Sequence, residues 1–406
     1  MSEGRLLPTR IGGSLGALRG DGRGWILLAV SVGWLLGLGI RLVFPAVLQH
    51  IRESFGIGLT TAGLLLSALW VGYALMQFPG GVAADRFGER TVLVTGLAVT
   101  TVGVLGVVVA PGVATFFLGT VLVGVGVGLF GTTRITILSD VFPERRGTAI
   151  GFNQAAGNVG TTVMPAAAGV LAVLVGWRWG FVVAVPCFVA VSLLLWRTLP
   201  SRTSTPAAFD RQGLRESLGD VRRAVSHPAV VFATVTMMLA SFIYQGFTGF
   251  FPTYLAAQKG LDAEVAATLL GVFFATAVVV QPVAGVARDR FGTRPTLVAV
   301  LVATALLLAS LPFVDGLVAL VGLTVLLSVQ LAFWPVGNAY VVEAVPDDIQ
   351  GTTVGLSRTV FLLVGATGPT FVGVAADAGG FDEAFLALAG LALLGVLPAS
   401  RLDAVE

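Results

Sequence analysis

The chain has 406 residues, of which 56% are hydrophobic and 11% are charged, and its formal net charge is +2 at pH 7. Soluble domains carry roughly 25% charged residues, so this chain cannot build an ordinary water-facing surface, and a soluble enzyme is excluded. The small basic excess is spread over loop arginines without a patch, which excludes a nucleic-acid partner, and a lipid bilayer is the expected environment.

Apolar runs long enough to cross a bilayer recur along the whole chain. A spanning helix needs ~20 such residues. We predict six spans near 25–49, 61–84, 91–110, 112–140, 148–175 and 178–197, and six more near 229–257, 263–287, 295–314, 316–342, 351–376 and 381–398. The first run lacks a small-residue cleavage site, so we interpret it as a helix and not as a removed signal peptide.

One long polar connection, Thr198–Pro228, divides six runs from six. It contains a stretch that could form a short amphipathic surface helix or remain an irregular linker. The predicted organisation is an N-terminal segment at 1–24, a six-helix half at 25–197, a linker at 198–228, a second half at 229–398 and a tail at 399–406.

The distribution of Lys and Arg over the loops predicts the orientation. One side of the membrane carries 18 of the 24 basic residues and the other carries 3, with Arg41, Arg134 and Arg358 left inside helices. Because the cytoplasmic side keeps the excess, both termini and the linker are expected in the cytoplasm of a multi-pass plasma-membrane protein.

The chain also contains an internal repeat. The segment GGVAADRFGERTVLV near residue 80 recurs as AGVARDRFGTRPTLV near residue 284, an offset of 204 residues that also relates Gln77 to Gln281 and Pro165 to Pro369. We therefore expect two copies of a six-helix unit. An even number of spans gives both copies the same orientation, with the repeat axis and a solute cavity along the membrane normal.

A motif in the loop after the second run, repeated after the eighth, resembles the signature G-x-x-x-D-R-x-G-R-R of the major facilitator superfamily. The first copy has Gly81, Asp85, Arg86, Gly88 and Arg90, and the second has Gly285, Asp289, Arg290, Gly292 and Arg294. The family's first arginine after the second glycine is Glu89 here and Thr293 in the second copy. The resemblance implies an all-α membrane protein of two pseudo-symmetric halves that transports a solute by alternating access.

Physical roles can be assigned to the motif residues. Gly81 is expected to allow close approach of backbones, and Gly88 a tight turn. The resemblance implies that Asp85 meets the N-terminus of the eleventh helix near Gly351, and latches the halves on the cytoplasmic side. It also implies that Arg90 or Arg86 pairs with Asp140. Alternatively, the motif charges only orient their loop.

Polar side chains avoid the third, sixth, ninth and twelfth runs, as in the superfamily, where every third helix faces lipid. The solute-site candidates in the other runs are Arg41, Arg134, Asn153, Gln154, Tyr244, Gln245, Trp334, Asn338 and Arg358. Gln77 and Gln281 are expected to bond helices together or to touch solute.

An arginine inside a membrane helix is costly and keeps its charge, so each one is a functional hypothesis. Arg41 is expected to line the cavity or to anchor its helix at the interface. Arg134 could bind solute or reach the cytoplasmic rim, and Arg358 could bind solute or pair with Asp85 or another rim carboxylate. All acidic residues lie in loops or at helix ends, so the expected solute is a small organic anion.

Other functions stay open at this point. Aromatic residues in the same runs, including Trp70, Tyr73 and Trp334, would suit efflux of hydrophobic or cationic drugs, and a sensor could keep the fold without transport. An enzyme is not expected, because neither a nucleophile–base pair nor a metal-ligand cluster is visible. No cofactor is expected, the single Cys187 cannot form a disulfide within the chain, and the protein is expected to be monomeric.

Overall fold

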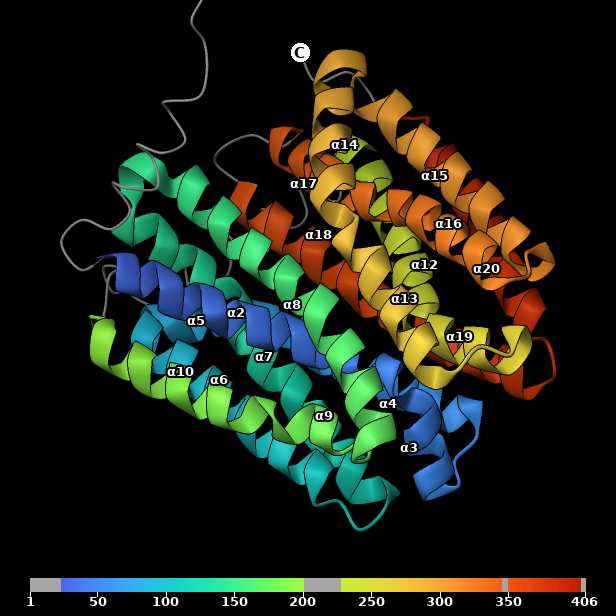
Figure 1. Cartoon of the computed structure of the whole chain (residues 1–406). Helices are drawn as coiled ribbons and strands as arrows, with labels where there is room; N and C mark the ends of the chain where they lie inside the picture. Colours follow the sequence, from blue (N-terminus) through green and yellow to red (C-terminus); the bar gives the residue numbers. More distant parts are fainter. Residues whose placement is uncertain (1–22, 201–227, 345–349, 403–406) are drawn as a thin grey trace, which may run out of the picture.

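The computed structural model describes residues 23–200, 228–344 and 350–402, which form helices and the turns between them (Figure 1). Twelve segments in these ranges are long and apolar enough to cross a membrane, so the predicted number of spans is confirmed. Helices satisfy their own backbone hydrogen bonds, which is what a hydrocarbon environment requires. Most of the predicted linker and its surface helix lie outside the described residues.

The first half of the chain supplies six spans. They are α2 (Arg23–Ala46), α4 (Leu59–Leu75) with α5 (Gln77–Phe87), α6 (Glu89–Val108), α7 (Val113–Val141), α8 (Arg146–Leu174), and α9 (Trp179–Val182) with α10 (Ala184–Thr198). A short helix, α3 (Leu48–Phe55), follows the first span, which therefore ends a few residues earlier than predicted.

The second half repeats this arrangement. Its spans are α12 (Pro228–Lys259), α13 (Ala263–Ala275) with α14 (Ala277–Phe291), α15 (Thr293–Ser310), α16 (Leu317–Leu327) with η4 (Ser328–Ala332) and α17 (Phe333–Glu343), α18 (Gln350–Gly365) with α19 (Gly368–Asp377), and α20 (Phe381–Ala399). Figure 1 shows the first half in blue to green and the second in yellow to red.

Several spans are divided near their middle, and prolines mark two of the divisions. Pro79 lies in the first turn of α5 and Pro369 in the first turn of α19. A proline in a first turn removes no helical hydrogen bond, because those N–H groups have no partner within the helix. The chain can therefore change direction between α4 and α5 and between α18 and α19.

The halves pack on each other mainly through α8 against α13 and α4 against α19. These contacts gather where α4 and α13 begin and α8 and α19 end. We call this the outer end, following the predicted topology, and the opposite end the inner end. Large apolar side chains on the perimeter are exposed, such as Leu174 at 72% and Val318 at 87%, as a lipid-facing surface permits.

Candidate functional site

Arg41 of α2 lies in the interior of the protein. Its side chain is 3% exposed, and its guanidinium carbon lies 4.1 Å from the ring centroid of Tyr73 and 4.6 Å from that of Trp70, both on α4. A guanidinium within about 6 Å of an aromatic centroid is attracted by the ring quadrupole. The side chain is thus held inward, and the alternative of an interfacial anchor does not fit its burial.

Tyr73 connects Arg41 to the other two intramembrane arginines. Its side chain interacts electrostatically with Arg41, Arg134 and Arg358. Arg41 and Arg134 come from the first half, whereas Arg358 comes from α18 in the second. We call these three residues the arginine cluster. It lies between the two halves of the chain.

Arg134 of α7 is held by two amides of α8. It donates to Oδ1 of Asn153 through Nη1 and to Oε1 of Gln154 through Nη2, the latter at 3.3 Å. Its guanidinium carbon also lies 3.7 Å from the ring centroid of Trp34, and Asn153 donates to Oγ of Ser31 at 3.4 Å. These contacts join α2, α7 and α8, so Arg134 has a structural role whether or not it also binds solute.

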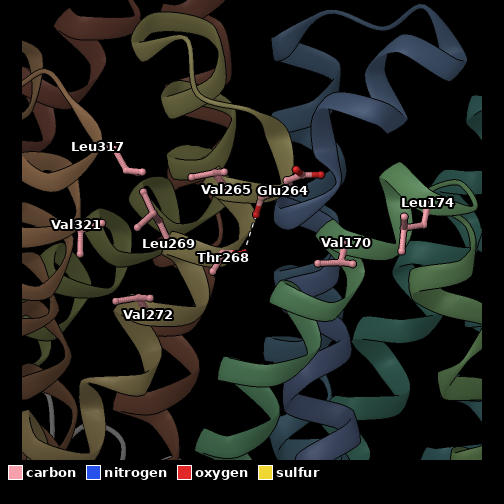
Figure 2. Close-up of a pocket in the computed structure, with 9 residues that line it drawn as sticks. All are labelled: Val170, Leu174, Glu264, Val265, Thr268, Leu269, Val272, Leu317 and Val321. Atoms are coloured by element: carbon pink, nitrogen blue, oxygen red, sulfur yellow. Dashed lines mark hydrogen bonds between the residues drawn. The ribbon is translucent and has the colours of Figure 1, made fainter.

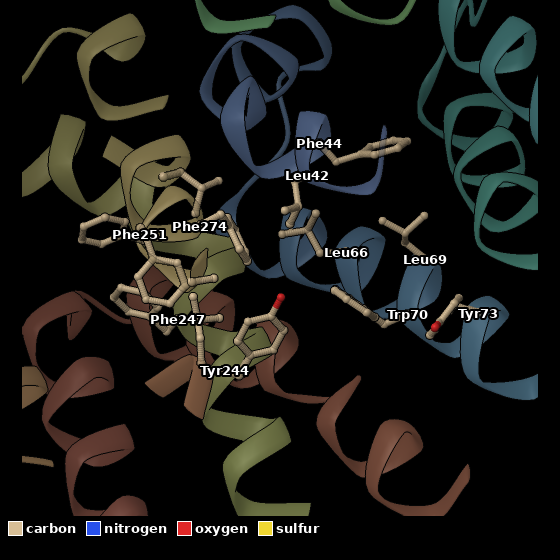
Figure 3. Packing of buried hydrophobic residues seen from close by; sticks show 14 of the residues in the cluster. Leu42, Phe44, Leu66, Leu69, Trp70, Tyr73, Tyr244, Phe247, Phe251 and Phe274 are labelled. Atoms are coloured by element: carbon tan, nitrogen blue, oxygen red, sulfur yellow. The ribbon is translucent and has the colours of Figure 1, made fainter. Parts of the chain in front are cut away.

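A row of aromatic side chains extends from the arginine cluster into the second half. The ring of Tyr244 on α12 lies 6.4 Å from Trp70 and 5.8 Å from Trp334 of α17, and Trp334 lies 5.9 Å from Phe361 of α18. Figure 3 shows Trp70 between Tyr73 and Tyr244. The row gives the cluster an apolar wall to which both halves contribute.

Two predicted solute-site residues make contacts within the second half instead. Gln245 donates to Oγ of Ser241 at 3.0 Å, and both pack against Gly365 of α18. Asn338 donates to the backbone carbonyl of Trp334, one turn earlier, at 2.7 Å. Neither amide makes a hydrogen bond to the arginine cluster among the described residues.

The glutamines related by the repeat behave differently from each other. Gln281 of α14 accepts a hydrogen bond from Nδ2 of Asn158 on α8 at 3.4 Å, which joins the two halves. Gln77 donates to the carbonyl of Tyr73 in its own span, at 3.4 Å. Of the two, Gln281 therefore bonds helices together.

Among the described residues, no carboxylate is among the groups with which Arg41 and Arg134 interact. Arg41 interacts electrostatically with Tyr73, Tyr244 and Arg358, and Arg134 with Tyr73 and the other two arginines. Several of their buried nitrogens lack a hydrogen-bond partner, namely Nε and Nη1 of Arg41, Nε of Arg134 and Nε of Arg358. Buried charged donors are costly when unpaired, so this site is suited to an anion.

The outer end is closed by close contact between the halves. A Cβ added at Gly169 of α8 would overlap with Ala267 of α13, and one added at Gly373 of α19 would overlap with the backbone of Leu59 at the start of α4. These two glycines are related by the repeat offset of 204 residues. Both seams therefore depend on the absence of a side chain at equivalent positions.

A carboxylate strengthens one of these seams. Asp377, the last residue of α19, accepts hydrogen bonds from the backbone N–H groups of Leu59 at 2.8 Å and Thr60 at 2.7 Å. Nearby, the hydroxyls of Ser67 and Thr370 lie 2.7 Å apart. Unpaired N–H groups at a helix N-terminus favour a negative charge, so Asp377 caps a helix of the opposite half.

The first copy of the repeated motif differs from its prediction in two respects. Gly81, Asp85 and Arg86 lie in the last turns of α5 and not in a loop, because the helix continues until Gly88, whose φ is +85°. Gly88 thus makes the predicted turn. The role assigned to Gly81 is wrong, since a Cβ there would meet nothing within 4 Å, and the close approach is at Gly80 beside α7.

The charged residues of the first copy do not share one partner. Asp85 is exposed, and the turn of α18 that it is expected to meet adjoins residues 345–349, outside the described residues. Arg90 donates to the carbonyl of Leu199 at 3.4 Å and lies over the ring of Trp196, so it contacts α10. Arg86 lies over the ring of Phe87. The latch and the pairing of Arg90 or Arg86 with Asp140 stay predictions.

The second copy is tied within its own half. Arg288 pairs with Glu343 at the end of α17 and donates to Oγ1 of Thr293 at 3.1 Å. Its neighbour Asp289 is exposed and lies 3.9 Å from it, and Gly292, with φ +89°, makes the turn. The remaining motif residues of this copy make no hydrogen bond or ion pair with the first half among the described residues. A Cβ at Gly285 would meet nothing within 4 Å, Arg290 lies over the ring of Phe291, and Arg294 is exposed.

A pocket of about 500 Å³ lies on the α8–α13 seam (Figure 2). Val170 and Leu174 line one side, and Leu317 and Val321 of α16 line the other. Because Leu174 is exposed on the perimeter and no member of the arginine cluster lines it, this pocket faces lipid and is separate from the candidate solute site.

Sequence reasoning did not place Tyr73, Trp70 or Asp377 in a functional site. Tyr73 and Trp70 stood out only as aromatic residues that would suit a drug, although their three-residue spacing puts them on one helix face. Asp377 lies one residue beyond the predicted eleventh run. No group of three or more potential metal ligands is present among the described residues, and Cys187 is a free, exposed thiol.

Comparison with known proteins gives consistent results. The chain matches the model of the Major Facilitator Superfamily over residues 29–275 and 254–403. It is 24% identical to a hexuronate transporter of Bacillus subtilis, with 93% of each chain covered, and 27% identical to the cis,cis-muconate transport protein of Acinetobacter baylyi, with 87% of each covered. The crystal structure of a bacterial homologue of the human lysosomal transporter Spinster, in an inward-facing and unoccupied conformation, superposes with a TM-score of 0.76 at 18% identity, covering 94% of this chain and 98% of that one.

Proposed function

The chain belongs to the major facilitator superfamily and is a multi-pass membrane transporter, and from that premise we propose that it carries a small organic anion by alternating access. The halves would rock around a solute held between them, exposing it to one side of the membrane at a time. The proposal needs an anion site between the halves and a closable seam at each end.

The arginine cluster is the observation that carries this proposal. Arg41 and Arg134 from one half and Arg358 from the other surround Tyr73, and the groups with which Arg41 and Arg134 interact include no carboxylate. Guanidinium groups bind carboxylates through paired, charge-assisted hydrogen bonds. An anion there would take up the unpaired N–H groups and be shared by both halves.

The named relatives support the same class of solute. Hexuronate and cis,cis-muconate, after which two relatives are named, are both organic anions with carboxylate groups. The aromatic row from Tyr73 to Trp334 would pack against the carbon skeleton of such a solute.

Efflux of cationic drugs remains the alternative, and the aromatic row is the feature that favours it. A cation in contact with that row would lie beside three arginines, without a carboxylate to balance it in the described part of the chain. Like charges at this range repel strongly in a low-dielectric interior. The anion is therefore the better fit.

The conformation suggests how the ends would alternate. With the outer end closed through Asp377, Gly373 and Gly169, the inner end is expected to be the open one, and Asp85 is then expected to be released from α18. Closing the inner end would bring Asp85 to that helix. We propose that the moving bodies are residues 25–197 and 229–398 of a monomer in the plasma membrane, with both termini cytoplasmic.

Binding and flux together test this proposal. The purified protein is heated with hexuronates, cis,cis-muconate and a set of cationic drugs, and its melting temperature is recorded, because a ligand that binds only the folded state raises it. Compounds that stabilise the protein are then tested for uptake into proteoliposomes. Stabilisation by cations alone would refute the anion site, and anion binding without flux would favour the sensor.

A further inference from the structure

The charge of the arginine cluster has a consequence for the empty transporter. Guanidinium groups stay protonated at any physiological pH, so the empty cluster carries three positive charges. Arg41 and Arg134 are each 3% exposed, and Glu89 is the one other charged residue that is buried as a whole residue among those that the structure describes. Glu89 lies in the first turn of α6 and is not among the groups that interact with either arginine.

The cost of these charges depends on which ends of the transporter are closed. With one end open, water can still reach Arg358, which is partly exposed in this structure, and can screen the charge of the cluster. To pass from one open state to the other, the halves must first close both ends, and the solvent between them is then reduced. Uncompensated charges are expensive to remove from water, and the cost falls when an opposite charge comes with them.

The division of the cluster between the halves adds to this cost. Arg358 belongs to α18 in the second half, while Arg41 and Arg134 belong to the first, and all three interact. Closing the inner end brings α18 toward the first half, so like charges approach each other. An anion bound between them replaces this repulsion with attraction, because it attracts guanidinium groups from both halves.

From these charges we propose that the transporter is an obligate anion exchanger, in which the halves rearrange with an anion bound and the empty protein is held in one open state. This inference rests on the proposed function of organic-anion transport. The anion carried across is released, and a second anion binds on the same side before the halves return. No net charge crosses the membrane when the two anions carry the same charge. No protonatable carboxylate is needed in the cluster.

The unpaired donors in the cluster point to the same ligand independently of the charge argument. Nε and Nη1 of Arg41, Nε of Arg134 and Nε of Arg358 are buried without a hydrogen-bond partner. Each of these groups is a donor, so an oxygen-rich anion satisfies them and a cation cannot. An anion is therefore expected to occupy the cluster during both conformational changes of the transport cycle.

The test compares exchange with net uptake in proteoliposomes, with labelled glucuronate as the first probe and cis,cis-muconate as the second. Vesicles contain either the unlabelled probe or no organic anion, and the membrane potential is clamped. Exchange predicts initial uptake into preloaded vesicles at least about tenfold above that into empty ones, which corresponds to a barrier difference of about 1.4 kcal/mol. An inward proton gradient should not raise uptake into empty vesicles.

Each other outcome has a distinct meaning. Equal rates in both preparations, or accumulation in empty vesicles driven by protons, would overturn exchange while leaving anion transport intact. No uptake of either probe in any vesicle would count against both the proposed function and the inference.

A variant tests the electrostatic cause directly. Arg358→Gln lowers the charge of the empty cluster, so the ratio of exchange to net uptake should fall severalfold even if both rates decrease. The control is Arg178→Gln, at the outer end, where the arginine lies over Trp177 and donates to the carbonyl of Val108. This control should keep the ratio of the wild type. An unchanged ratio in Arg358→Gln would show that its charge does not hold the empty protein back.

Discussion

The carboxylate of Asp377 accepts a hydrogen bond from the backbone N–H of Thr60 at 2.7 Å, joining residues that are 317 positions apart and belong to opposite halves. The same carboxylate accepts the N–H of Leu59, so both of its oxygens are used on the first turn of α4. The contact exists only while the outer end is closed. Its loss should therefore change the balance between conformations more than the stability of either half.

We predict that Asp377→Asn shifts the transporter toward open outer ends. A side-chain cap on a helix N-terminus contributes about 0.5–2 kcal/mol, which is a change of roughly 2- to 30-fold in a two-state ratio. Spin labels at Glu53 and Gln258, both exposed near the outer end, report the opening as a longer distance. Cys187 is first replaced by serine.

A second aspartate provides the control for this experiment. Asp382, in the first turn of α20, accepts a hydrogen bond from the hydroxyl of Tyr254 at 2.6 Å, and both residues belong to the second half. Asp382→Asn should leave the distance distribution unchanged. If both aspartate variants give the wild-type distribution, the cap does not bias the conformation.

Gly373 should affect the same seam sterically, whereas Asp377 acts through its charge. Gly373→Leu places a side chain where even a Cβ overlaps the backbone of Leu59, and a backbone neighbour cannot move aside cheaply. The outer ends should then be held apart, which the same labels would detect. Gly390→Leu on α20 is the matched control, because nothing lies within 4 Å of its added Cβ. Equal distances in both leucine variants would contradict the role of the seam.

The sequence predicted the features of this fold that depend on local chemistry. Long apolar runs must be helices in lipid, so all twelve spans were predictable, with boundary errors of a few residues. The turns at Gly88 and Gly292 were also predictable, since φ values of +85° and +89° favour glycine. The repeat gave the two halves before any contact was known.

Relations between helices were not predictable in the same way. Periodicity gives the face on which Trp70 and Tyr73 lie, but the neighbour of that face depends on how α4 packs against α2 and its Arg41. The error at Gly81 has a similar origin, because successive residues on a helix point about 100° apart. Gly80, one position earlier, is the residue that faces α7.

The orientation in the membrane is a separate prediction. If the excess of basic residues faces the cytoplasm, a single cysteine at Ser204, in the linker, should be protected in intact cells from an impermeant thiol reagent. A single cysteine at Gln258, near the outer end, should react. Both are made in a Cys187→Ser background. Labelling of the Ser204 position from outside intact cells would reverse the assignment of inner and outer ends.

Asn153 should stabilise the first half by holding Arg134. Asn153→Ala removes a hydrogen bond to a buried charged donor, for which the expected loss of stability is about 1–3 kcal/mol, visible as a lower melting temperature in detergent. In an Arg134→Met background the same change should cost less, because the partner is already absent. Asn338→Ala is the control, since that amide bonds only its own helix. Equal losses in both backgrounds would show that the pair is not coupled.

Arg41 should contribute directly to anion affinity. Its guanidinium lies against Tyr73 and Trp70, has no carboxylate among its electrostatic partners, and leaves two buried nitrogens unpaired. A bound carboxylate would use those donors, so Arg41→Gln should weaken binding by about 1.5–3 kcal/mol, the contribution of a hydrogen bond to a charged group. Arg41→Lys should restore only part of the loss, because an ammonium replaces a planar fork with a point charge.

Titrations of the purified wild type and both variants, with an anion selected by the melting-temperature screen, measure these affinities. Arg178→Gln again serves as the control, since it removes an arginine that packs on an aromatic ring at the outer end, away from the cluster. If Arg41→Gln weakens binding no more than Arg178→Gln does, the anion does not depend on Arg41. If Arg41→Lys binds as tightly as the wild type, the charge matters and the paired geometry of the guanidinium does not. The expected order of affinity is therefore wild type, then Arg41→Lys, then Arg41→Gln. The folded yield of all three should be comparable, because Trp70 keeps its packing against Tyr73 and Tyr244.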